Sequence, residues 1–117
     1  MSNAFGEALR EYRRALGVSQ RELAERAKLD FSYISKMENG RLPPPAADTV
    51  VLICNALKIP PEELLALTGK IPSAVQQTVS TNRTAQEFLR EVQEMELTDD
   101  EWKGMVKSLR SLRREKG

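Results

Sequence analysis

The segment SQRELAERAKLDFSYISKMENG, residues 19–40, contains two short helical patterns separated by a turn. The first pattern begins at Ser19, whose hydroxyl can cap the amide of Glu22 while the Glu22 carboxylate returns to Ser19, an arrangement known as a capping box. The second begins at Asp30, a residue type favoured at helix N-termini, and stops at Gly40. We therefore expect two short helices joined by a turn of three or four residues.

The apolar positions of these two helices predict how they pack. Leu23, Ala24 and Ala27 lie on one side of the first helix, and Ile34 and Met37 lie one turn apart on the second. Because Ala24 is small, it allows the helices to approach closely and to cross steeply, which is helix-turn-helix geometry. This packing leaves one side of the second helix exposed and able to enter a DNA major groove. The exposed side carries Phe31, Ser32, Ser35 and Lys36.

Helical spacing of apolar residues continues on both sides of this segment, and no stretch alternates as a strand would. We expect an all-α protein with eight helices. They cover about residues 5–16, 19–26, 30–39, 46–57, 60–69, 73–79, 84–95 and 98–112. The first five helices are expected to form one domain over residues 1–70. Residues 71–117 would form a C-terminal helical region that ends in a hairpin, with a hinge at residues 80–83.

Composition excludes most enzyme chemistry. The chain has no His and one Cys, Cys54, so it cannot build a His or Cys zinc site, a Cys-His dyad, a Ser-His-Asp triad or a disulfide. Cys54 lies on the apolar side of its helix and is expected to be a buried core thiol. No apolar run is long enough to span a membrane. We expect a cytoplasmic protein that is not an enzyme and binds neither a metal nor a cofactor.

Charge is nearly balanced in both parts of the chain. Residues 1–69 carry nine basic and nine acidic side chains, residues 70–117 carry nine and eight, and the formal net charge is +1. Bulk attraction to DNA phosphates is therefore weak. If the chain binds double-stranded DNA, its positive charge has to gather on one face, and two copies are expected to bind a symmetric site.

Taken together, these residues closely resemble the XRE family of bacterial and phage regulators, over about residues 5–69. The matching positions are Arg13, Gly17, Ser19-Gln20, Leu23-Ala24, the run from Tyr33 to Gly40 and the run from Leu57 to Leu65. The resemblance implies a lambda-repressor-like domain of five helices that binds double-stranded DNA. It also implies that Arg13 and Glu38 form a buried ion pair that ties the first helix to the third.

Individual roles follow partly from this resemblance and partly from the residues. Base contacts are expected from Phe31, Ser32, Ser35 and Lys36. Phosphate contacts are expected from Gln20, Lys28, Tyr33, Asn39 and Arg41. For Gln20 the role also follows from the exposed amides and the dipole at a helix N-terminus.

Two positions depart from the family pattern. Lys28 stands where the turn usually has Gly, so a left-handed backbone there would cost roughly 1 kcal/mol. Phe31 stands where polar side chains are common. Its ring either contacts thymine methyl groups or folds back onto Tyr33 or the proline loop of residues 42–45.

The C-terminal helices have too little core to stand alone, so their apolar side chains must be covered. We expect a homodimer through these helices, and a sequence-specific transcriptional regulator that represses by occluding a promoter. Two alternatives remain open. In the first, the chain is an antitoxin or adaptor whose C-terminal helices bind another protein, such as a toxin. In the second, a regulatory peptidase controls the chain by cleaving the hinge at residues 80–83.

Overall fold

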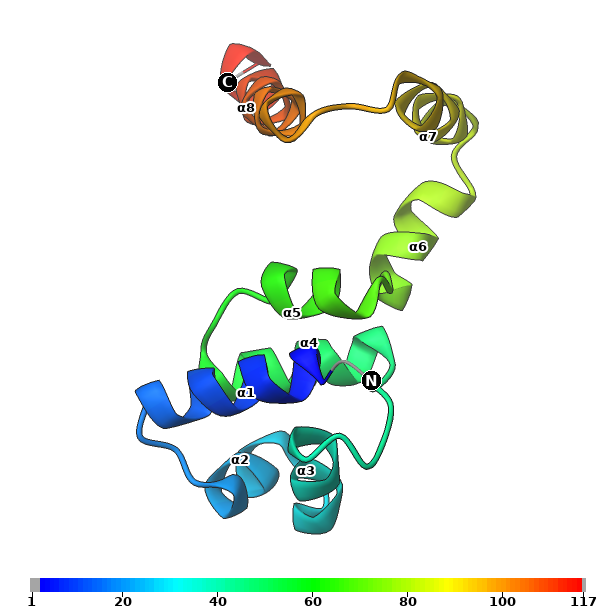
Figure 1. Ribbon diagram of the computed structural model, residues 1–117. Helices are drawn as coiled ribbons and strands as arrows, with labels where there is room; N and C mark the ends of the chain where they lie inside the picture. The colour runs from blue at the N-terminus through cyan, green and yellow to red at the C-terminus, as the bar shows by residue number, and fades with distance from the viewer. Residues whose placement is uncertain (1–2, 117) are drawn as a thin grey trace. The chain divides into compact units, whose positions relative to one another are not determined.

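The computed structural model describes residues 3–116, which contain eight α-helices and no strand (Figure 1). The helices are α1 Ala4–Ala15, α2 Gln20–Ala27, α3 Phe31–Glu38, α4 Ala47–Leu57, α5 Glu62–Thr68, α6 Ser73–Ser80, α7 Arg83–Met95 and α8 Asp99–Lys116. The all-α class and the number of helices predicted from the sequence are thus confirmed for the described residues.

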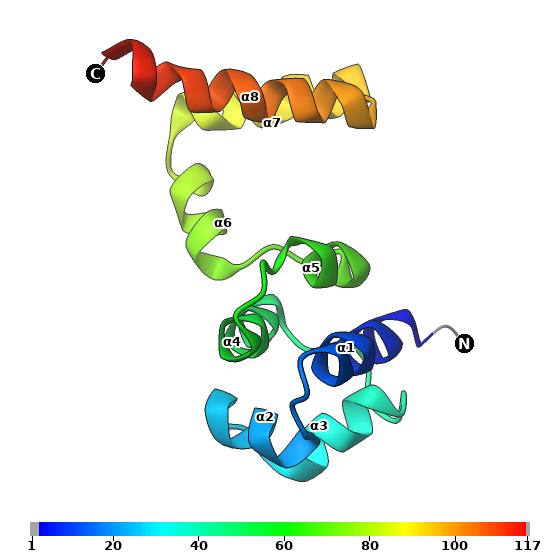
Figure 2. The ribbon, with the colours of Figure 1, turned by 90° about the vertical axis from the view of Figure 1, so that its left-hand side faces the viewer.

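The chain divides into two compact units, the first ending at Gln76 and the second beginning at Gln77 within α6. In the first unit α2 packs against α3 and α4, α1 packs against α3 and α5, and α4 packs against α5 (Figure 2). One apolar core joins all five helices. Its buried members are Phe5, Leu9, Val18, Leu23, Ala24, Ala27, Ile34, Met37, Val50, Ile53, Cys54, Leu57 and Leu64.

Local side-chain caps fix the two helices of residues 19–40. Ser19 Oγ accepts a hydrogen bond from the Glu22 amide at 3.1 Å, and Glu22 Oε1 accepts one from the Ser19 amide at 3.4 Å. Asp30 Oδ1 accepts a hydrogen bond from the Ser32 amide at 2.7 Å, which lowers the pKa of Asp30. Between the helices, Lys28 adopts the left-handed conformation with φ of 58°. The capping box and the strained turn are therefore both present.

Two helix starts and the length of the hinge differ from the sequence predictions. Helix α5 begins at Glu62, so the preceding prolines lie outside it. Helix α7 begins at Arg83 instead of Thr84, because Asn82 Oδ1 accepts the hydrogen bond of the Ala85 amide at 2.9 Å. The expected hinge is shorter as well, since Ser80 ends α6 and Arg83 begins α7, leaving residues 81–82 between them.

The second unit contains α7 and α8, which run in opposite directions as the sequence predicted for a hairpin (Figure 2). Viewed end-on, the two helices stand apart from each other (Figure 1). Large apolar side chains on both helices are exposed. They are Phe88, Leu89, Met95, Trp102, Met105, Val106, Leu109 and Leu112. None of the described helices combines the length and apolar character that crossing a membrane requires.

Candidate DNA-contacting site

Helix α3 has one buried and one exposed side. Ile34 and Met37 are buried against the core, whereas Ser32 and Lys36 are exposed. Ser35 is partly buried, and its hydroxyl accepts a hydrogen bond from Asn39 Nδ2 at 3.4 Å. The helix is therefore anchored through its apolar side, and its opposite side is open to a ligand.

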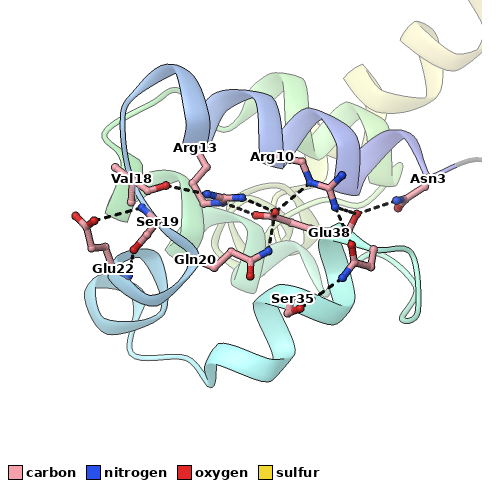
Figure 3. Close-up of polar contacts among 10 residues, drawn as sticks. Asn3, Arg10, Arg13, Val18, Ser19, Gln20, Glu22, Ser35 and Glu38 are labelled. Carbon is pink, nitrogen blue, oxygen red and sulfur yellow. Dashed lines mark hydrogen bonds and ion pairs between the residues drawn. The ribbon is translucent and has the colours of Figure 1, made fainter.

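A buried ion pair connects α3 to α1. Glu38, at the end of α3, is fully buried, and Arg13 of α1 binds it with two hydrogen bonds, Nε to Oε2 at 2.7 Å and Nη2 to Oε1 at 2.8 Å (Figure 3). The third Arg13 nitrogen, Nη1, donates to the Val18 carbonyl at 2.9 Å. Two parallel bonds between a guanidinium and a carboxylate fix distance and orientation together. The pair implied by the family resemblance thus holds the C-terminal end of α3 against α1.

Two more side chains converge on the same carboxylate. Gln20 Nε2 donates to Glu38 Oε1 at 3.0 Å, and Arg10 Nε lies 3.4 Å from the same oxygen (Figure 3). Burial alone would raise the pKa of Glu38. The hydrogen bonds of Arg13 and Gln20, together with the charge of Arg13, outweigh burial and hold that pKa below its usual range. Glu38 is consequently a carboxylate at neutral pH.

Gln20 and Asn39, both expected to contact phosphates, also make hydrogen bonds within the protein that the sequence did not predict. Gln20, at the start of α2, uses its side-chain amide on Glu38, and Asn39 Oδ1 accepts a hydrogen bond from Arg10 Nη2 at 2.8 Å. Arg10 was not among the predicted site residues. Its spacing of three from Arg13 places both guanidinium groups on one side of α1, which was the available signal. Both expected phosphate-contacting side chains are therefore held in place by the network around Glu38.

Beside this network lies a hollow rich in arginine, which we call the arginine hollow. It lies between α1 and the starts of α2 and α3. It is lined by Arg10, Arg13, Arg14, Ser19, Gln20, Arg21, Phe31 and Asn39. Although the net charge of the chain is close to zero, four arginines gather at this face. Arg13 is buried and paired with Glu38, so the exposed positive charge of this hollow comes from its other arginines.

Phe31 has a partner that the sequence analysis did not anticipate. The Arg21 guanidinium lies over the Phe31 ring, 4.5 Å from its centroid, and Phe31 remains 37% exposed. A cation over an aromatic face is an attractive arrangement. Phe31 therefore packs under Arg21, and its ring is still partly available to a ligand.

The remaining predicted phosphate contacts lie at two places. Lys28 is exposed in the turn between α2 and α3, and Tyr33 is partly buried on α3. Arg41 is exposed just past α3, where its backbone amide donates to the Lys36 carbonyl at 2.9 Å. Lys28 thus precedes α3, Tyr33 lies within it, and Arg41 follows it.

The Arg21–Phe31 contact can be tested by stability measurements. We expect Arg21→Ala and Phe31→Leu each to lower the free energy of unfolding by about 0.5–1 kcal/mol, and the double variant to lose less than the sum, because both remove one cation–π contact. Urea unfolding followed by circular dichroism provides the values. Arg26→Ala is the matched control, since Arg26 lies 3.6 Å from exposed Glu22 on its own helix and makes no ring contact among the described residues. Additive losses from the two changes would contradict the contact.

Cys54 takes no part in this face. Its side chain is fully buried in α4, and burial, with a smaller contribution from the charge of Glu62, raises the pKa of the thiol to about 11. The thiol is therefore protonated at neutral pH and unreactive, as expected for a core residue. Among the described residues, no group of three His, Cys, Asp or Glu side chains is arranged to hold a metal ion.

Comparison with known proteins relates this fold to a group of regulators. The chain is 39% identical over 67 residues to the uncharacterized HTH-type transcriptional regulator RghRB of Bacillus subtilis (strain 168), a match covering 57% of this chain and 48% of RghRB. The chain thus spans about half the length of this curated relative. The crystal structure of the clp gene regulator ClgR from C. glutamicum matches 57% of this chain and 86% of ClgR at 33% identity, with a TM-score of 0.51.

A third comparison extends over the C-terminal helices. The structure of a SinR protein/SinI protein complex matches 94% of this chain and 98% of the compared chain, with a TM-score of 0.51 and 18% identity, a likeness of fold alone.

A family model described as the helix-turn-helix domain matches residues 4–67, which include α2, α3 and the arginine hollow. The chain therefore belongs to the helix-turn-helix domain family, of the type found in XRE-family transcriptional regulators.

Proposed function

We propose that this protein is a sequence-specific DNA-binding transcriptional regulator, not an enzyme, which represses by occupying a promoter in cytoplasmic DNA. The single observation that carries the proposal is the exposed side of α3, where Ser32 and Lys36 are open while Ile34 and Met37 anchor the helix. A helix held in this way fits the major groove, where the edge of each base pair is distinct.

In this proposal the side chains divide into two groups. Phe31, Ser32, Ser35 and Lys36 contact base edges, with Lys36 donating to guanine and the exposed part of the Phe31 ring touching thymine methyl groups. Gln20, Lys28, Tyr33, Asn39 and Arg41 contact phosphates and set the position of α3 along the groove. The arginine hollow supports this division, because it brings positive charge next to the starts of α2 and α3, where a phosphate strand would pass.

The test begins with selection of bound sequences from a random duplex library, followed by titration at several salt concentrations. We expect Lys36→Ala and Ser32→Ala to relax preference at particular base pairs, with a loss of about 5- to 150-fold on the selected site, equivalent to about 1–3 kcal/mol. Gln20→Ala and Arg41→Ala should weaken all sequences alike, and Arg41→Ala, which removes a positive charge, should also reduce the salt slope by about 1.

The controls separate binding from folding. Lys58→Ala changes an exposed lysine that adopts the left-handed conformation after α4, away from α3, and should leave the selected sequence unchanged. Uniform loss from all four site variants would contradict the division into base and phosphate contacts. A wild-type chain that enriches no sequence would contradict the proposed function itself.

The proposed regulator acts as a homodimer through α7 and α8. Two helices with eight exposed large apolar side chains have too little core of their own, so a covering surface is required. A dimer also presents two copies of α3 to half-sites about one helical turn apart, which compensates for the near-neutral charge of one chain. A toxin or another protein on the same helices remains the competing occupant, and an isolated chain that stays monomeric would favour it.

A further inference from the structure

The second unit has an uneven distribution of charge along its sequence. Residues 91–101 contain six acidic side chains and no basic one, and we call them the acidic segment. Residues 102–116 contain six basic side chains and one acidic one, and we call them the basic segment. The end of α7 and the first turn of α8 are therefore negative, while the rest of α8 is positive.

Among the described residues, the acidic and basic segments of one chain are joined by the ion pair of Asp99 with Lys103 alone. Because α7 and α8 run in opposite directions, the acidic end of α7 meets the acidic start of α8 at the turn between them. The ion pairs described for this unit lie within single helices, Arg83 with Glu87 at 3.8 Å and Lys103 with Asp99 at 3.3 Å. Among the residues that the structure describes, no ion pair therefore joins the acidic part of α7 to the basic part of α8.

The apolar side chains of α8 form a stripe with the spacing of a helix-pairing seam. Trp102, Met105, Leu109 and Leu112 follow one another at intervals of three, four and three residues, and Leu109 is 64% exposed. With Phe88 of α7 they line an apolar groove of about 370 Å³. An alternation of three and four places successive side chains along one side of a helix, where they interlock with a partner helix.

We propose that this stripe pairs with the same stripe of a second copy, with the two α8 helices antiparallel about a two-fold axis level with residues 106–107. The proposal deepens the homodimer in the proposed function and rests on it. In this register Trp102 lies level with Leu112 of the second copy, and Met105 with Leu109 of the second copy. Asp99 of each chain then lies beside Arg113 of the other, on the flank of the seam.

The charges favour a second copy of the chain as the partner of this stripe, with its α8 helix running antiparallel. In an antiparallel pair the acidic segment of each chain faces the basic segment of the other, and the two-fold axis repeats this match of opposite charges. A parallel pair would place acidic against acidic and basic against basic. Asp99 stays available for this contact, because its side chain is 86% exposed although it lies near Lys103.

The experiment exchanges the two flanking charges. Using the full chain without DNA, the dimer dissociation constant is measured by sedimentation and by light scattering after gel filtration. Asp99→Arg and Arg113→Asp, made singly, should each weaken the dimer about tenfold, because each turns two attractive pairs into repulsive ones. The double variant re-forms both pairs with the charges exchanged, and should return to within about twofold of wild type.

A matched control and two further readings complete the design. Lys107 lies on the side of α8 away from the stripe, so Lys107→Asp should leave the dimer dissociation constant unchanged. Leu109→Ser should raise that constant at least a hundredfold while the helical content is retained. A monomeric wild-type chain, or a double variant no better than the single ones, would overturn the proposal. Because no DNA is present, a chain that dimerises as expected yet selects no sequence would contradict DNA recognition and leave this interface standing.

Discussion

Replacing Glu38 with Ala is expected to lower the free energy of unfolding by about 3–5 kcal/mol, the largest effect of any single change at this site. The substitution leaves the Arg13 guanidinium buried without its carboxylate, and it also removes a hydrogen-bond acceptor from Gln20 and Arg10. Urea unfolding of the full chain, followed by circular dichroism, provides the measurement.

Two comparisons identify the cause as a stranded charge. The double variant Arg13→Met/Glu38→Leu removes both charges and keeps apolar volume, so it should be more stable than Glu38→Ala. Glu7→Ala, at an exposed position on α1, should change stability by less than about 0.5 kcal/mol. A double variant as unstable as Glu38→Ala would show that shape, and not charge, accounts for the loss.

The same pair makes stability depend on acid pH. The pKa of Glu38 in the folded chain lies below its usual value, because the bonds of Arg13 and Gln20 and the charge of Arg13 exceed the effect of burial. A group with a lowered folded pKa contributes stability above its unfolded pKa, about 4.3, and loses that contribution as the pH falls through the folded value. Wild type should therefore lose more stability than Glu38→Gln between neutral pH and strongly acidic pH.

Gly6→Ala is expected to have the second largest effect, a loss of about 2–3 kcal/mol. A Cβ atom at this position would lie 2.5 Å from the Met37 carbonyl oxygen and 2.8 Å from that of Glu38, both backbone atoms at the end of α3. Such atoms cannot move aside as a flexible side chain can, so α1 has to shift away from α3. The same shift should weaken DNA binding, because α1 holds the end of the proposed recognition helix.

Gly104 is the matched control for this change. It also lies within a helix, α8, but no atom stands within 4 Å of its Cβ position. Gly104→Ala should raise helical content and stabilise α8 by about 0.5–1 kcal/mol, since Ala is the better helix former. Thermal unfolding of both variants gives the comparison, and equal effects of the two substitutions would contradict the close approach at Gly6.

Features that depend on residues close together in the chain were predictable from the amino-acid sequence. Ser19 with Glu22, and Asp30 with the Ser32 amide, form caps between residues two or three apart, so the starts of α2 and α3 were predictable. Periodic apolar residues likewise determined which side of α3 is buried. The start of α7 was predicted at residue 84 and lies at Arg83, because the Asn82 side chain caps the helix.

Tertiary structure alone decided the contacts made across the fold. Arg10 and Gln20 meet at Glu38 although they lie 28 and 18 residues from it, and Arg21 lies over Phe31 from a different helix. These meetings depend on the crossing angles and separations of packed helices, which no local spacing encodes. Sequence thus determined which helices form and which sides they bury, whereas the packing of α1 on α3 determined how the side chains around Glu38 are held.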